Sequence, residues 1–101
     1  MPNFVFTYRI RPGTVRTPES ADAWRSWFDG IAGHVAELGK PGLETARVGN
    51  CGPDTELGGY SLITAADLDE AQSLAKACPA LAGDGGVEMA ELGEVPPRPG
   101  S

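Results

Sequence analysis

The stretch NFVFTYRI, residues 3–10, decides the fold because its side chains alternate in character. Phe4, Phe6 and Tyr8 are aromatic. They alternate with a valine at 5, a threonine at 7 and an arginine at 9. A period of two with aromatic and β-branched residues predicts a strand. Pro12 and Gly13 then predict a turn.

A long amphipathic helix is expected next. Thr17 can cap its free N–H groups, Pro18 suits the first helical position, and Glu19 complements the positive helix end. Gly39 is the expected left-handed cap at the other end. The apolar stripe, at spacings typical of a helix, consists of Trp24, Trp27, Phe28, Ile31, Val35 and Leu38.

The rest of the chain predicts three strands and a second helix. Their expected ranges are a strand at 43–48, a loop at 49–54, a strand at 58–64, a helix at 68–78 stopped by Pro79, and a strand at 87–92. The order βαββαβ favours an α+β, ferredoxin-like sandwich with both helices on one face of an antiparallel sheet.

The second face of this sheet has no cover within the chain. We assign one face to Phe4, Phe6, Tyr8, Tyr60 and Leu62, and the other to Val5, Thr7, Arg9, Ser61 and Ile63. Neither set is plainly solvated, so we expect a homodimer that pairs the sheet faces, a dimeric α/β-barrel assembly with room for a small cavity.

The composition of the chain limits the classes of function that it can have. The 101 residues carry a net charge of −6, which disfavours binding to nucleic acid and to anionic membranes. We expect one domain at 1–95, a flexible tail at 96–101, no secretory leader and a cytoplasmic location. Cys51 and Cys78 are expected as free thiols, and one histidine without metal-ligand spacing predicts no metal site.

Five segments resemble the YCII-related family, also called the DGPF-domain family. They are LGGYSLI at 57–63, DLDEA at 67–71, GVEM at 86–89, FVFTY at 4–8 and HVAEL at 34–38. The resemblance spans nearly the whole chain. It implies a ferredoxin-like fold, a homodimer of apposed sheets, and a histidine-centred site in members proposed to be enzymes.

The same resemblance implies a range of roles. One branch is associated with dehydrochlorination of chlorinated hydroxyhydroquinones, and others are fused or neighbouring to sigma factors. The family's name-giving loop reads CGPD at 51–54 here. An acidic partner for the histidine would be sought near the end of the first strand, where YRIR at 8–11 has no carboxylate.

His34 is the candidate catalytic residue. On the predicted helix it lies beside Trp27 at the edge of the apolar stripe, where burial favours the neutral imidazole that a general base needs. Arg9 could pair with a phenolate or carboxylate, and Tyr8 and Tyr60 could donate hydrogen bonds or stack. A structural boundary histidine and an interface arginine explain the same pattern, and both interpretations stay open.

Three functions follow from these residues and the resemblance. The first is a small lyase or isomerase-type enzyme without a cofactor, with His34 as acid and base on an aromatic or enolisable metabolite. The second is a module that binds a ligand or protein without catalysis, linked to transcription. The third is a cofactor-independent monooxygenase on a similar dimeric scaffold.

Overall fold

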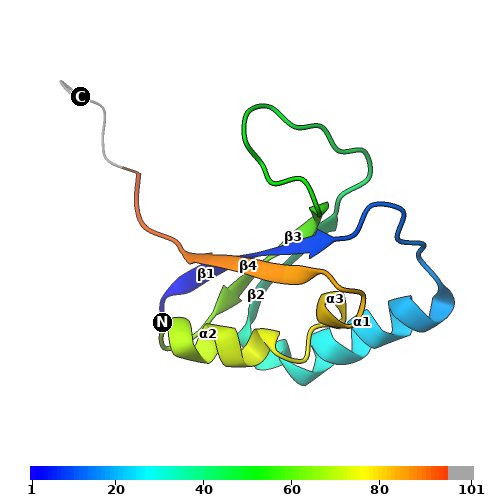
Figure 1. Ribbon diagram of the computed structural model, residues 1–101. Helices are drawn as coiled ribbons and strands as arrows, with labels where there is room; N and C mark the ends of the chain where they lie inside the picture. Colours follow the sequence, from blue (N-terminus) through cyan, green and yellow to red (C-terminus); the bar gives the residue numbers. More distant parts are fainter. Residues whose placement is uncertain (96–101) are drawn as a thin grey trace.

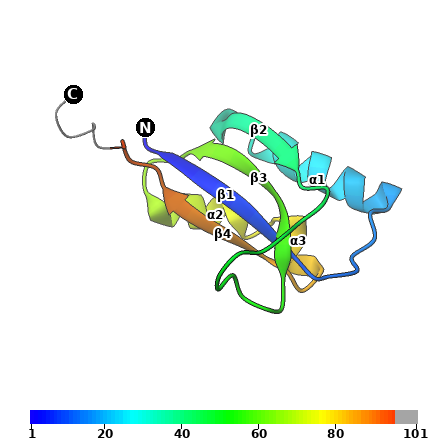
Figure 2. The ribbon, with the colours of Figure 1, turned by 90° about the horizontal axis from the view of Figure 1, so that it is seen from above.

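The structure, a computed structural model, describes residues 1–95, so the expected tail at 96–101 lies outside the described residues. Its elements are β1 (Asn3–Ile10), α1 (Pro18–Gly30), the 3-10 turn η1 (Ala32–His34), β2 (Val35–Pro41), β3 (Glu56–Thr64), α2 (Leu68–Ala75), α3 (Pro79–Ala82) and β4 (Gly86–Glu91). The four strands form an antiparallel sheet in the order β2-β3-β1-β4. The helices lie on one side of it (Figures 1 and 2), as the ferredoxin-like prediction requires.

The core lies between the sheet and the helices. Phe4 and Phe6 on β1 and Ile63 on β3 are fully buried, which confirms the alternation read from the first strand. From the helix layer, Trp27 and Ile31 are buried, and Ala71 and Ala75 of α2 are buried against the same cluster. Trp24 and Phe28 pack against it while half buried, as the helical stripe predicts for the first part of α1.

The predicted first helix is too long. α1 ends at Gly30, and the chain passes through η1 into strand β2 at Val35, so His34, Val35 and Leu38 are not on a helix. Glycines at 30 and 33 weaken a helix here, each by about 1 kcal/mol, and pairing with β3 then decides in favour of a strand. Leu38, predicted in the apolar stripe, is 58% exposed.

The strand predicted at 43–48 is also wrong. These residues belong to an irregular connection between β2 and β3, in which Leu43 is 90% and Val48 93% exposed. β2 occupies the edge of the sheet beside β3, the position that this predicted strand would have filled. In Figure 1 this connection rises on the side of the sheet opposite the helices.

The later elements follow the prediction more closely. β3 and β4 coincide with the expected strands to within two residues. The second helix ends at Ala75, earlier than predicted, and Pro79 begins the short helix α3 instead of only stopping α2. Cys78, at the start of α3, is 2% exposed and belongs to the core.

The predicted partition of the two sheet faces is wrong for β3. Phe6 pairs with Ser61 and Val5 with Leu62, so Ser61 shares the helix-covered face with the β1 aromatic residues. Because the side chains of a strand alternate, a misjudged register moves a whole strand to the wrong face. The face away from the helices, called the open face below, carries Val5, Thr7, Arg9, Leu57, Tyr60 and Leu62.

Gly39 has the left-handed backbone expected of it, but within a strand. Its φ is +76°, and it lies where the β2–β3 register shifts between Glu37 and Lys40. A Cβ atom there would stand 1.8 Å from the carbonyl oxygen of Tyr60. Only glycine therefore allows β2 to approach β3 this closely.

We expect Gly39→Ala to reduce the free energy of unfolding by about 2–4 kcal/mol, because the substitution adds a backbone clash to an unfavourable φ. Gly33→Ala is the matched control, since a Cβ there meets nothing within 4 Å. Urea denaturation followed by tryptophan fluorescence measures both. Equal midpoints for the two variants would contradict the role of Gly39.

Candidate functional site

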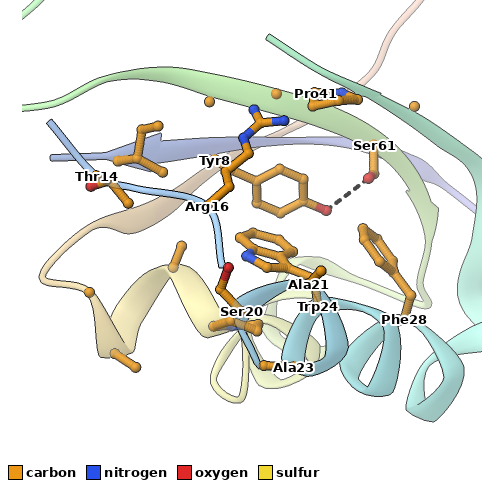
Figure 3. A pocket seen from close by; sticks show the side chains of 18 of the residues that line it. Tyr8, Thr14, Arg16, Ser20, Ala21, Ala23, Trp24, Phe28, Pro41 and Ser61 are labelled. Carbon is orange, nitrogen blue, oxygen red and sulfur yellow. Dashed lines mark hydrogen bonds between the residues drawn. The ribbon is translucent and has the colours of Figure 1, made fainter. Parts of the chain in front are cut away.

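A cavity of about 710 Å³ lies between α1 and the sheet, next to the connection that joins β1 to α1. Its walls come from β1, α1, the ends of β2 and β3, and α3 (Figure 3). Thr14, Val15 and Arg16 of the connection line it and are exposed, so this side forms the solvent-facing rim.

Two local features place the cavity walls. The alternation of β1 directs Tyr8 to the helix side of the sheet, where it is 5% exposed. α1 begins with a capping box, in which Thr17 accepts from the Ser20 amide and the Ser20 hydroxyl accepts from the Thr17 amide. This fixes the first turn of α1, and Trp24 and Phe28, one turn apart, then face the cavity from the same side.

Tyr8, Trp24 and Phe28 form an aromatic wall. The Tyr8 and Trp24 ring centroids are 4.8 Å apart with planes at 77°, an edge-to-face contact. The ring centroid of Phe28 lies 6.4 Å from that of Tyr8 and 6.0 Å from that of Trp24. Trp27 packs behind them and donates its indole N–H to the Leu74 carbonyl at 3.0 Å. The cavity thus has rigid π-faces on one side.

A chain of hydroxyl groups, the hydroxyl relay, lies at the floor of the cavity. Tyr8 Oη donates to Ser61 Oγ at 2.8 Å, and Ser61 Oγ donates to the Leu38 carbonyl at 2.6 Å. The carbonyl can only accept, so the direction of both bonds is fixed. The Tyr8 oxygen keeps its lone pairs for a further donor.

Burial sets the protonation state of Tyr8. Removal from water raises its pKa from 10.0 to about 12, although the Ser61 hydrogen bond lowers it in part. Tyr8 is therefore a neutral phenol at neutral pH. Burial likewise raises the pKa of the Cys78 thiol to about 11, which makes it a poor nucleophile.

Three charged residues line the cavity: Arg16, Lys40 and Glu19. Arg16 Nη2 donates to the Gly42 carbonyl at 3.1 Å and so connects the rim to the end of β2. Figure 3 shows the Arg16 side chain reaching from the connection toward Pro41. Lys40 pairs with Tyr60, so its side chain shares the open face and Arg16 is the cation of the cavity rim.

Arg9 lies on the open face and not in the cavity. Its guanidinium donates to Thr55 Oγ1 at 3.2 Å, to the Thr55 carbonyl at 2.9 Å and to the Cys51 carbonyl at 3.3 Å. Arg47 also donates to the Thr55 carbonyl. Arg9 therefore holds the β2–β3 connection against the sheet. Cys51 is an exposed free thiol in that connection.

His34 lies at the other end of the sheet. Its Nδ1 is 2.9 Å from the Thr64 carbonyl, which requires Nδ1 to carry the proton and leaves Nε2 as an acceptor. Glu70 Oε1 is 3.8 Å from Nδ1 and also accepts from the Ala66 amide at 2.9 Å. Thr64 pairs with Asn3 on β1, whereas Gly59, which lines the cavity, pairs with Tyr8. Asn3 and Tyr8 are five residues apart, so about 17 Å of strand separates the His34 contact from the cavity.

The structure brings only part of the predicted site together. Tyr8 lines the cavity, whereas Arg9 and His34 do not. Tyr60 belongs to the β3 segment that borders the cavity, but it pairs with Thr7, and its side chain shares the open face. Ser61 and Arg16 were not singled out by sequence. Glu70, the carboxylate beside His34, comes from α2 and not from the end of β1.

Within residues 1–95, no group of three His, Cys, Asp or Glu residues is placed to hold a metal ion. No helix of the same region is long and apolar enough to cross a membrane.

Comparison with known proteins identifies the fold. No family model and no curated protein sequence matches the chain. A solved structure, 5-chloro-2-hydroxyhydroquinone dehydrochlorinase (TftG) from Burkholderia phenoliruptrix AC1100 in complex with 2,5-dihydroxybenzoquinone, superposes with a TM-score of 0.66. The match covers 92% of this chain and 95% of that chain at 18% identity. The chain is therefore similar in fold to that protein over nearly its whole length, which supports the predicted ferredoxin-like fold.

Proposed function

We propose that the cavity binds a small, planar, oxygenated aromatic ring such as a phenol or a hydroxyquinone. The observation that carries this proposal is the hydroxyl relay from Tyr8 through Ser61 to the Leu38 carbonyl, placed beside an aromatic wall. Ligand sites of this kind combine an apolar lining with a few polar groups that fix orientation.

The lining suits a flat ring. Trp24 and Phe28 offer π-faces, and the volume of about 710 Å³ lies in the range of roughly 300–1,000 Å³ typical of sites for small organic ligands. Aromatic contacts of this type contribute about 0.5–1.5 kcal/mol beyond the burial of apolar area.

The relay selects for a hydroxyl group. Because both relay protons are already committed toward the Leu38 carbonyl, the Tyr8 oxygen accepts a hydrogen bond from the ligand and does not donate one. A ring hydroxyl is such a donor, whereas an ether or an ionised oxygen is not. The neutral state of Tyr8 at neutral pH maintains this preference.

The structural neighbour supports the same class of ligand. TftG is a dehydrochlorinase of a hydroxyhydroquinone, and its complex holds 2,5-dihydroxybenzoquinone, a flat ring with hydroxyl oxygens. We propose a related lyase-type activity on an oxygenated ring for this protein. Membership of the YCII-related family is part of the same proposal.

We expect 4-hydroxybenzamide, a neutral phenol, to quench tryptophan fluorescence on binding, and Tyr8→Phe to weaken the affinity about five- to tenfold through loss of the hydroxyl acceptor. Ser26→Ala, which removes an exposed hydroxyl outside the cavity, is the control. An unchanged dissociation constant for Tyr8→Phe would contradict the relay as the recognition element.

A second, separate proposal concerns proton transfer by His34. The contact with Thr64 fixes the tautomer that leaves Nε2 free, and the Glu70 carboxylate at 3.8 Å stabilises the imidazolium once a proton is accepted. This is the arrangement of a general base oriented by an acidic group. Because His34 is remote from the cavity, this chemistry would use a ligand bound at the opposite end of the sheet.

Exchange of the ring hydrogens of 2,5-dihydroxybenzoquinone in D₂O, followed by proton NMR, tests this role. A base at His34 predicts that His34→Gln lowers the catalysed exchange rate at least tenfold. Glu70→Gln is expected to lower it less. Equal exchange in wild type and His34→Gln would exclude His34 as the base.

We also propose that the open face pairs with a second copy of the chain. Leu57 and Tyr60 on this face are 44% and 36% exposed, and Val5 and Leu62 form a cross-strand pair on the same face. Burial of this apolar surface against an identical face would stabilise a homodimer.

Sedimentation velocity distinguishes the assembly states. Leu57→Glu is expected to convert the dimer to a monomer, because it places a carboxylate in the proposed interface. Leu81→Glu on α3 is the matched control, since Leu81 is 45% exposed and lies on the opposite side of the molecule. A monomeric wild type at micromolar concentration would refute the pairing.

A further inference from the structure

We propose that Arg16 selects, among aromatic rings, those that carry an ionised oxygen on the side opposite their hydroxyl group. This inference rests on the proposed function and specifies its substrate class. The ligand would be an aromatic carboxylate that also carries a hydroxyl group, with its protonated hydroxyl at Tyr8 and its negative oxygen at the cavity rim.

The first observation is the unused hydrogen-bonding capacity of Arg16. Its guanidinium has five N–H donors, and one nitrogen, Nη2, donates to the Gly42 carbonyl. Within residues 1–95, no carboxylate lies within the 4.0 Å of an ion pair with Arg16. Arg16 is thus a positioned cation without a counter-charge, anchored at the edge of an apolar cavity (Figure 3).

The second observation is the place of this cation. Arg16 lines the same cavity as Trp24 and Phe28. Lys40 does not add to the charge there, because its side chain shares the open face with its cross-strand partner Tyr60. A positive rim beside low-dielectric aromatic walls attracts an anion and weakens its exchange with solvent. Bidentate contact with a carboxylate is a further property of arginine.

The polarity of the hydroxyl relay completes the argument. The Tyr8 oxygen accepts a hydrogen bond, so it repels an ionised ligand oxygen and favours a protonated one. The Arg16 guanidinium, which only donates hydrogen bonds and is positively charged, favours an ionised ligand oxygen. A ring whose two polar ends differ in protonation therefore has one favoured orientation. A hydroxybenzoate meets this requirement, because its carboxyl group is ionised at neutral pH while its phenolic hydroxyl keeps the proton.

The test compares two probes with the same ring and hydroxyl: 4-hydroxybenzoate, an anion, and 4-hydroxybenzamide, its neutral analogue. We expect the wild type to bind the benzoate about tenfold more tightly, as titration calorimetry or quenching of tryptophan fluorescence would measure. Arg16→Gln should abolish this preference while it leaves the affinity for the benzamide within about twofold. Arg16→Lys should restore part of it.

Arg25→Gln provides the matched control. Arg25 is exposed on α1 and pairs with Asp22 at 3.1 Å, so its removal changes net charge equally without a change at the cavity. The preference should survive in Arg25→Gln and should weaken with added salt. 3-Hydroxybenzoate is the second anionic probe, and Arg16→Gln should weaken its binding by a similar factor.

The outcomes separate this inference from the proposed function. Equal affinity of the wild type for benzoate and benzamide, or a preference that persists in Arg16→Gln, overturns the role of Arg16 and leaves ring binding intact. Failure of all three probes to bind overturns both. Loss of benzamide binding in Arg16→Gln would show that Arg16 shapes the cavity and does not select charge, which also overturns the inference.

Discussion

The hydrogen-bond chain from Tyr8 through Ser61 to the Leu38 carbonyl is the interaction on which the rest of the structure depends. It joins β1, β3 and β2 on the helix side of the sheet and satisfies Ser61, a fully buried hydroxyl. Such a group would destabilise the core by about 1–3 kcal/mol without a partner. Gly39 makes the chain possible, because its left-handed backbone lets the irregular part of β2 lie against Tyr60 and Ser61.

The cavity follows from unequal packing of the two helix layers. α2 meets the sheet through Ala71 and Ala75, small residues that permit close approach. α1 meets it through Trp24, Trp27 and Phe28, large rings that contact one another and keep the helix away from the strands. In both ribbon views the N-terminal end of α1 extends past the sheet. The same aromatic residues that build the core therefore also leave space beside it.

Sequence alone predicts those features that depend on local pattern. The aromatic alternation of β1, the capping of α1 at Thr17 and the left-handed Gly39 are properties of a few neighbouring residues, and each is present. The predicted end of α1 is wrong because Val35 and Leu38 continue the helical spacing by coincidence. Only their pairing with β3 shows that this segment is a strand. The predicted sheet face of Ser61 is wrong for a related reason, because the register of β3 is set by its pairing with β1 and not by its own residues.

The candidate site shows the same division between local and long-range information. Tyr8 could be identified from its strand, but Ser61, Arg16 and Glu70 acquire their roles from partners 23 to 53 residues away; for Glu70 the partner is His34 on another element. No pattern in the sequence marks such pairs. The expected acidic partner of His34 was sought on β1, whereas the fold supplies it from the first turn of α2.

The pKa of Tyr8 shows which ionisation can control the cavity. Burial raises its folded-state pKa from the ordinary value of 10.0 to about 12, so the stability linked to the neutral phenol is fully present below pH 10 and is lost as the pH rises through about 12. The relay is therefore intact throughout the range in which a hydroxyquinone loses its proton. Any pH dependence of ring binding near neutrality must then arise from the ligand, whose ionised form meets the guanidinium and whose remaining hydroxyl meets the neutral phenol.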